Sequence, residues 1–254
     1  MKYCLSNRQS KNLLIKADEI FVRHNDYRAI IDYIVEYPEA IIIFDIPGDK
    51  FEDLKEQILK YKDLTDKLVC RIDSLERAYW FNSRGIKFYY SYPVSTWYDV
   101  KGLIDLGVEY ITITAPLTFC MPQLEKLNMK FRMVPNVAYD AYIPRENGIY
   151  GQWVRPEDVS YYEKGVYVFD FENCTLDQEK TLYHIYAENK NWPGNLNILI
   201  TNLNINADNR GFPEELGEFR SSCGQTCMSG GRCHFCETAF KFEKTIRKYK
   251  EELD

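Results

Sequence analysis

The sequence has few of the signals that mark the common hydrolase and membrane classes. It contains no G-x-S-x-G, no glycine-rich phosphate loop after a strand and no H-E-x-x-H, and only three of its 254 residues are histidine. Hydrolysis by a standard nucleophile or a zinc triad therefore has no support. No run approaches the roughly 20 apolar residues of a membrane-spanning helix, and the first residues lack the apolar stretch of a signal peptide. We therefore expect a cytoplasmic protein without a membrane partner.

Basic residues are in deficit as well. Lys and Arg number 32 against 38 Asp and Glu, which gives a formal net charge of -6. An acidic balance argues against a protein that wraps nucleic acid by electrostatics, although a locally basic groove stays open. With 45% hydrophobic and 28% charged residues, the composition is typical of a globular chain that can bury a substantial core.

Short β-rich runs recur along the chain, separated by segments with helical spacing. The runs are 19–23, 40–46, 67–72, 87–92, 110–114, 130–135, 166–171 and 196–201. Between two of them, Phe51, Leu54 and Ile58 recur at helical spacing with charges on the other face. Strands that alternate with amphipathic helices predict a parallel sheet. Eight units fit a closed (β/α)₈ barrel over residues 1–210 better than the alternative, an open doubly wound sheet.

Two segments depart from this alternation. The connection 136–165 is far longer than a usual loop of this kind, so it is either a lid or binding loop, or a decorated surface loop. Its tyrosines and Trp153 indicate that it packs over something. Residues 211–254 are predicted to form an extension that carries a cysteine-rich segment and ends in an amphipathic helix.

Candidate catalytic residues follow from the barrel prediction, because barrel active sites lie at the carboxyl ends of the strands. Asp45 and Arg71 end two neighbouring runs, while Asp170 and Glu172 end a later one and share the inward face by strand alternation. We predict that these four side chains orient a substrate or move protons. A structural ion pair between Asp45 and Arg71 is the alternative. His24, at another strand end, is either an acid–base group or a cap.

Four cysteines lie close together near the end of the sequence, with the spacing C-x₃-C-x₅-C-x₂-C. They are Cys223, Cys227, Cys233 and Cys236. Four thiolates suit both structural Zn²⁺ and a [4Fe-4S] cluster, and the sequence leaves that choice open. Disulfides are the alternative in an oxidising compartment. Cys174 could replace one of the four ligands, and His234 is a fifth candidate.

One segment resembles a known family. "GQWVRPEDVSYYEKGVYVFDFE" (151–172) is similar to the W-[VI]-R-P-E-D…Y stretch of the collagenase-like peptidase family, and "EYITITAPLTF" (109–119) is similar in style to its strands. The match extends over about residues 85–236, and Arg155, Pro156, Glu157 and Asp158 carry it. The resemblance implies a barrel with a cysteine-ligated [4Fe-4S] cluster. It also implies an oxygen-independent hydroxylase or an RNA-modifying protein rather than a true peptidase.

Together these features favour a barrel enzyme whose iron–sulfur cluster supports redox modification, such as hydroxylation, of an RNA or small-molecule substrate. Such an enzyme would need an electron donor or a protein partner. The alternative is a non-enzymatic barrel, in which zinc on the same cysteines fastens the last helix and the tyrosine-rich loop binds a protein. A peptidase is the third candidate.

Overall fold

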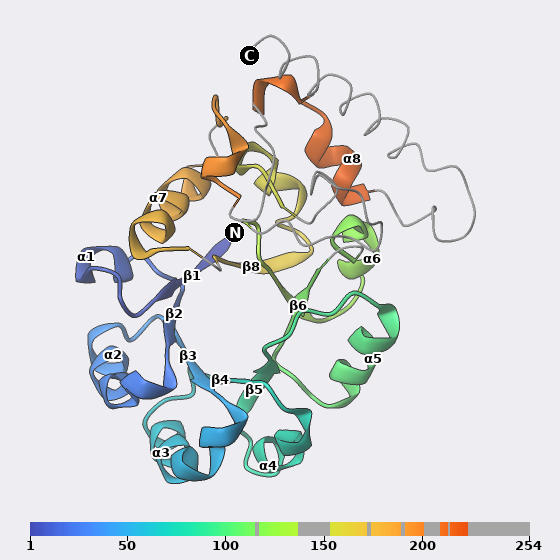
Figure 1. The fold of residues 1–254 in the computed structure, drawn as a ribbon. Coiled ribbons are helices and arrows are strands. Elements are labelled where there is room, and N and C mark those ends of the chain that lie inside the picture. The colour runs from blue at the N-terminus through green and yellow to red at the C-terminus, as the bar shows by residue number, and fades with distance from the viewer. Residues whose placement is uncertain are drawn as a thin grey trace.

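The protein forms a closed barrel of eight parallel strands, in which each strand pairs with its neighbours in chain order (Figure 1). The computed structural model describes residues 1–114, 117–136, 153–171, 174–188, 191–200, 209–212 and 214–222. The strands are β1 Lys2–Ser6, β2 Glu19–Val22, β3 Ile41–Ile46, β4 Leu68–Ile72, β5 Lys87–Tyr90, β6 Tyr110–Ile113, β7 Lys130–Met133 and β8 Val166–Asp170. This architecture confirms the predicted (β/α)₈ barrel.

Helices surround the barrel on its outside (Figure 1). They are α1 Lys11–Leu14, α2 Ile30–Glu36, α3 Phe51–Leu64, α4 Ala78–Asn82, α5 Trp97–Asp105, α6 Met121–Leu124, α7 Leu176–Ala187 and α8 Leu216–Ser222. In α3 the predicted apolar stripe is buried, with Phe51, Leu54 and Ile58 turned inward. In α7 a capping box between Thr175 and Gln178 satisfies amide groups that the first turn would otherwise leave unpaired. None of the helices in the described ranges is long and apolar enough to span a bilayer.

Two of the predicted strand positions require correction. The first strand is Lys2–Ser6, which the β-rich runs did not include, and it closes the barrel by pairing with both β2 and β8. The run 196–201 is predicted as a strand, but Leu196–Ile198 form a 3₁₀ helix. Its buried side chains are Leu196, Leu199 and Ile200, a spacing of three and four residues that buries one face of a helix and not of a strand.

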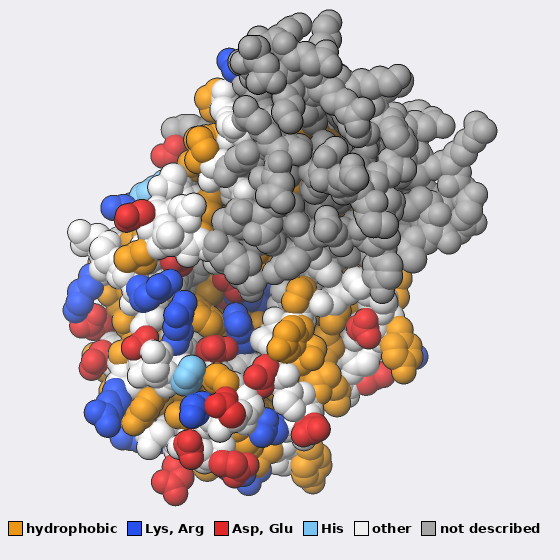
Figure 2. All heavy atoms as spheres, viewed as in Figure 1, with side chains coloured by type: hydrophobic (Ala, Val, Ile, Leu, Met, Phe, Trp, Pro, Cys, Tyr) orange, Lys and Arg blue, Asp and Glu red, His pale blue; other side chains and the backbone are white. Residues whose placement is uncertain are grey.

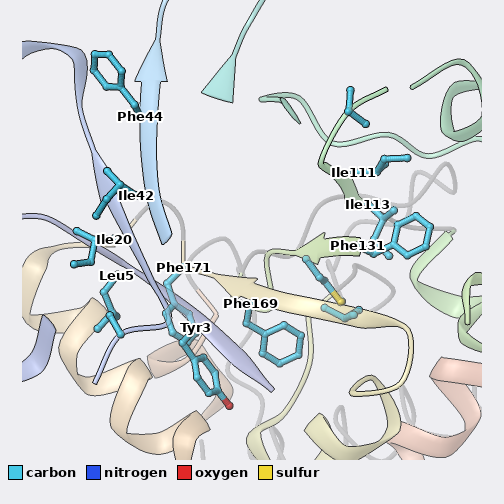
Figure 3. Packing of buried hydrophobic residues seen from close by; sticks show 14 of the residues in the cluster. Tyr3, Leu5, Ile20, Ile42, Phe44, Ile111, Ile113, Phe131, Phe169 and Phe171 are labelled. Carbon is cyan, nitrogen blue, oxygen red and sulfur yellow. The ribbon is translucent and has the colours of Figure 1, made fainter. Parts of the chain in front are cut away.

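Apolar side chains fill the layer between strands and helices. Leu5, Ile20 and Ile42 stand opposite one another on adjacent strands and form one row of this layer (Figure 3). All three are at most 1% exposed, and burial of each such side chain contributes roughly 1.5–3 kcal/mol. Alternate residues on the same strands point into the barrel, where Cys4, Ile43 and other side chains form a second, smaller cluster.

The long connection between β7 and β8 is described from residue 153 onward, and this part is a packed structural element. Trp153 is 1% exposed, and the guanidinium of Arg220 in α8 lies 4.2 Å from the Trp153 ring centre. Arg155 Nε and Nη2 donate to both carboxylate oxygens of Asp158, at 2.6 and 2.8 Å. Pro156 begins a short 3₁₀ helix, Pro156–Tyr161, that packs against α8. The R-P-E-D segment therefore helps to hold α8 on the barrel.

Candidate active site

A pocket of about 400 Å³ opens at the carboxyl ends of β1 to β4 and β8. Its charged and titratable lining residues are Arg8, Arg23, His24, Asp45, Arg71, Asp170, Cys174 and Glu179. Figure 2 views this end of the barrel and shows basic and acidic side chains interspersed around its middle. A pocket of this size with a few convergent polar groups is typical of small-molecule sites. Its position is where barrel enzymes carry their active sites.

Asp45 and Arg71 form an ion pair on one wall of the pocket. They are register partners on β3 and β4, and Arg71 Nε lies 3.1 Å from Asp45 Oδ1. About a quarter of each side chain is exposed, 26% for Arg71 and 23% for Asp45. The Arg71 guanidinium also lies 4.9 Å from the ring centre of Phe21 on β2, which limits its rotation. The two residues thus meet at strand ends and form the ion pair that was the alternative to a catalytic role, which stays a prediction.

Burial raises the pKa of the Asp45 carboxyl above its usual value. Arg71, His24 and Arg23 act in the opposite direction, because positive charge stabilises the carboxylate, but desolvation has the larger effect. A carboxyl with a raised pKa is a better proton acceptor once it ionises, and raised carboxyl pKa values recur at catalytic positions.

Asp170 reaches the floor of the pocket from the inward face of β8, as strand alternation predicted. Its Oδ2 accepts a hydrogen bond of 2.9 Å from Arg132 Nη2. Arg132 Nη1 pairs in turn with Glu19, and neither of these two side chains has any exposed surface. The Arg132 guanidinium lies 4.9 Å from the Tyr89 ring centre inside the barrel. Arg132 therefore connects Glu19 in the barrel core to Asp170 at the floor of the pocket.

Sequence reasoning missed Glu19, Arg132 and Glu179. Glu179 on α7 accepts hydrogen bonds from the Ser6 amide at 2.5 Å and the Ser6 hydroxyl at 2.9 Å, which ties α7 to the end of β1. In the sequence, only the alternation of polar and apolar residues in "KFRM" indicates that Arg132 points into the barrel. No comparable signal connected Glu179 with a residue so distant in sequence.

Cys174 also lines the pocket, where burial raises the pKa of its thiol to about 12. The side chain is thus a neutral thiol at physiological pH. His24 lines the pocket too, and its Nδ1 is buried without a hydrogen-bond partner among the described residues.

Several predicted site residues lie outside the residues that the structure describes. They are Glu172, Cys223, Cys227, Cys233, His234 and Cys236. Within the described ranges, no three His, Cys, Asp or Glu side chains are grouped so that they could hold one metal ion. Ligation of a metal by the four cysteines therefore stays a prediction.

No family model and no curated protein match this sequence. Among solved structures, one described as native KDPGal is similar with a TM-score of 0.45 and 10% identity, over 74% of this chain and 92% of the other. A second, described as a 4-hydroxy-2-oxoglutarate aldolase/2-deydro-3-deoxyphosphogluconate aldolase from TTHB1, has a TM-score of 0.41 and 12% identity, over 73% and 90%. A third, a cube-shaped protein cage designed from fused oligomeric domains, has a TM-score of 0.45 and 10% identity, over 98% and 81%.

The prediction of an iron–sulfur hydroxylase is contradicted by this comparison. One of the three structures is described as an aldolase, and none of the three is described as an iron–sulfur protein. The sequence prediction assigned a redox reaction from the cysteine spacing and a short matching segment, and neither of these defines the chemistry of the barrel mouth. At such low similarity the aldolase activity is not transferred to this chain either.

Proposed function

We propose that the protein is an enzyme that transfers a proton to or from a small anionic molecule at the barrel mouth, with Asp45 as the acid–base group. The observation that carries this proposal is the Asp45 carboxyl itself. It lies in a pocket of about 400 Å³ at the strand ends, its pKa is raised by burial, and Arg71 is paired to it at 3.1 Å. Nothing in this reaction requires the cysteine cluster.

Asp45 and Arg71 have separate roles in this reaction. Asp45, once ionised, accepts a proton from an O–H group of the substrate or from a C–H group next to a carbonyl, and the electron pair of the broken bond stays on the substrate as an alkoxide or an enolate oxygen. Arg71 then lies next to the developing negative charge, which a preorganised guanidinium stabilises in a partly water-excluded site. Return of the proton to another atom of the substrate completes an isomerisation.

The proposal is tested by proton exchange, which detects cleavage of a C–H bond even when no net reaction follows. The protein is incubated in D₂O with a panel of 2-oxo acids, hydroxy acids and sugar phosphates, and NMR follows the loss of individual C–H signals. We expect enzyme-dependent exchange at one carbon of one substrate class. Asp45→Asn should reduce its rate by about 10²–10⁴-fold, the usual range for removal of an acid–base group.

The matched control is Asp49→Asn, because Asp49 is a largely exposed aspartate outside the pocket lining. This variant should exchange at the wild-type rate. Exchange that persists in Asp45→Asn, or falls equally in both variants, would contradict a role for Asp45 as the proton acceptor.

The metal centre and the family resemblance are separate proposals. The spacing of Cys223, Cys227, Cys233 and Cys236 supports ligation of zinc or an iron–sulfur cluster, and the R-P-E-D segment supports a relationship to the collagenase-like peptidase family. Metal analysis of anaerobically purified protein should give stoichiometric zinc or iron, and replacement of two cysteines by serine should release it. A folded, metal-free protein with these thiols in disulfides would overturn the metal proposal.

A further inference from the structure

We infer that Arg8 and Arg23 form a subsite that binds the phosphate group of a phosphorylated small-molecule substrate. The inference rests on the site proposed above and adds the chemical class of its substrate. It comes from the ion pairs around the pocket, in which Arg8 and Arg23 take no part.

Each carboxylate among the described lining residues already has a partner. Asp45 pairs with Arg71, Asp170 with Arg132, and Glu179 accepts two hydrogen bonds from Ser6. In each case the partner is a group other than Arg8 or Arg23.

Arg8 and Arg23 line the same pocket, and neither forms an ion pair with any residue of the described ranges. Both are exposed to solvent. The pocket therefore contains two guanidinium groups that form no ion pair within the described part of the protein.

The two arginines lie at the ends of neighbouring strands. Arg8 is in the turn just after β1, and Arg23 follows β2 directly with an extended backbone (φ -71°, ψ 153°). Ser6 of β1 and Phe21 of β2 are register partners that also line the pocket. Adjacent strands are about 4.8 Å apart, so the two side chains start close together on one part of the rim.

The strand order then places this pair beside the acid–base group. Val22 on β2 is the register partner of Phe44 on β3, so Arg23 and Asp45 are each one residue further along adjacent strands. Around the rim the order is Arg8, Arg23, Asp45 and Arg71. A group bound by the first two residues leaves the rest of a small molecule next to the last two.

A phosphate group matches this subsite in charge and geometry. A phosphate monoester carries close to two negative charges at pH 7 and can therefore pair with both guanidinium groups, whereas one carboxylate carries a single charge. Guanidinium groups donate paired N–H groups that fit phosphate oxygens. A pocket of about 400 Å³ has room for a small phosphorylated molecule.

Calorimetric titration with inorganic phosphate, at constant ionic strength, tests the subsite independently of any reaction. We expect saturable one-to-one binding to the wild type. Arg8→Gln and Arg23→Gln should each weaken binding at least tenfold, and the double variant should not bind detectably. Both side chains are exposed, so the variants should keep the wild-type melting temperature.

Two further variants distinguish specific from general effects. Arg28→Gln removes an exposed arginine outside the pocket lining and should leave phosphate affinity unchanged. Asp45→Asn should bind phosphate at least as tightly as the wild type while losing proton exchange, so the two proposals fail separately.

Three results would overturn the inference. One is phosphate binding that survives loss of both arginines. Another is an equal loss of affinity in Arg28→Gln, which would mean that surface charge alone attracts phosphate. The third is a tenfold tighter affinity for malonate than for phosphate, because this would assign the subsite to dicarboxylates.

Discussion

At the scale of single residues, Asp45 combines a negative charge with partial burial, and this combination has a cost in stability. Burial raises its pKa in the folded protein above the value of 3.8 for a free aspartate. Between these two pKa values the folded state binds more protons than the unfolded state. Stability therefore falls as pH rises through that window and stays lower above it.

Asp45→Asn should consequently change stability in a pH-dependent manner. The amide resembles the protonated carboxyl, so the variant escapes the cost of ionisation. We expect its stability relative to the wild type to be higher at pH 7 than at pH 3.5, measured by urea unfolding at both pH values. The opposite trend would mean that the Arg71 ion pair outweighs desolvation.

Arg132 is the residue whose loss should destabilise the protein most directly. Arg132→Met would leave Glu19, which is fully buried, without its cation, and breaking a buried pair in this way costs about 3–5 kcal/mol. Combining it with Glu19→Gln removes the unpaired charge and should recover part of the loss. A double-mutant cycle measured by urea unfolding checks this. Additive effects would show that the two side chains do not interact.

The sequence predicted the part of the site that depends on strand position. It was possible to identify Asp45, Arg71 and Asp170, because each lies at the end of a β-rich run, at a position whose side chain points into the barrel. Arg132 and Glu179 could not be identified, because their roles depend on partners from distant strands and helices. Arg8 was missed for a related reason, since it follows a first strand that was not assigned.

At the scale of elements, the contact between α8 and the Pro156–Tyr161 helix tolerates no additional volume. A Cβ atom on Gly217 would lie 2.6 Å from both Asp158 and Tyr161. Gly217→Ala should therefore destabilise the protein by about 1–3 kcal/mol through overpacking, although alanine is the better helix former.

Gly102 on α5 is the matched control for this prediction. Apart from its chain neighbours and the backbone of its own helix, no described residue lies within 4 Å of a Cβ atom built there. Gly102→Ala should therefore stabilise the protein by about 0.5–1 kcal/mol through helix propensity. Thermal unfolding of both variants measures the difference. A stabilised Gly217→Ala variant would contradict the close packing of α8.

Element prediction from the sequence succeeded where strands and helices alternate with distinct periods. It was wrong at 196–201, because a short apolar run is compatible with either period and only burial of Leu196, Leu199 and Ile200 distinguishes them. It also missed Lys2–Ser6, although this strand is as long as others that were predicted. The segment is a strand because β2 and β8 flank it on both sides.

At the scale of the whole molecule, β1 is the element that turns an open sheet into a barrel. It pairs with β2 on one side and with β8 on the other. Deletion of residues 1–6 would expose two unpaired strand edges and open the outer apolar layer to water. We expect the truncated protein to lose cooperative thermal unfolding by circular dichroism and to bind a hydrophobic dye. A sharp unfolding transition would contradict this role for β1.

Closure by β1 also constrains how the protein is made in a cell. Lys2 pairs with Val168, so β1 leaves the ribosome long before its partner β8 has been translated. At about 5–20 residues per second this delay is on the order of ten seconds. During that time the nascent chain has an uncovered sheet edge, which makes it a natural client for chaperones that bind emerging polypeptides.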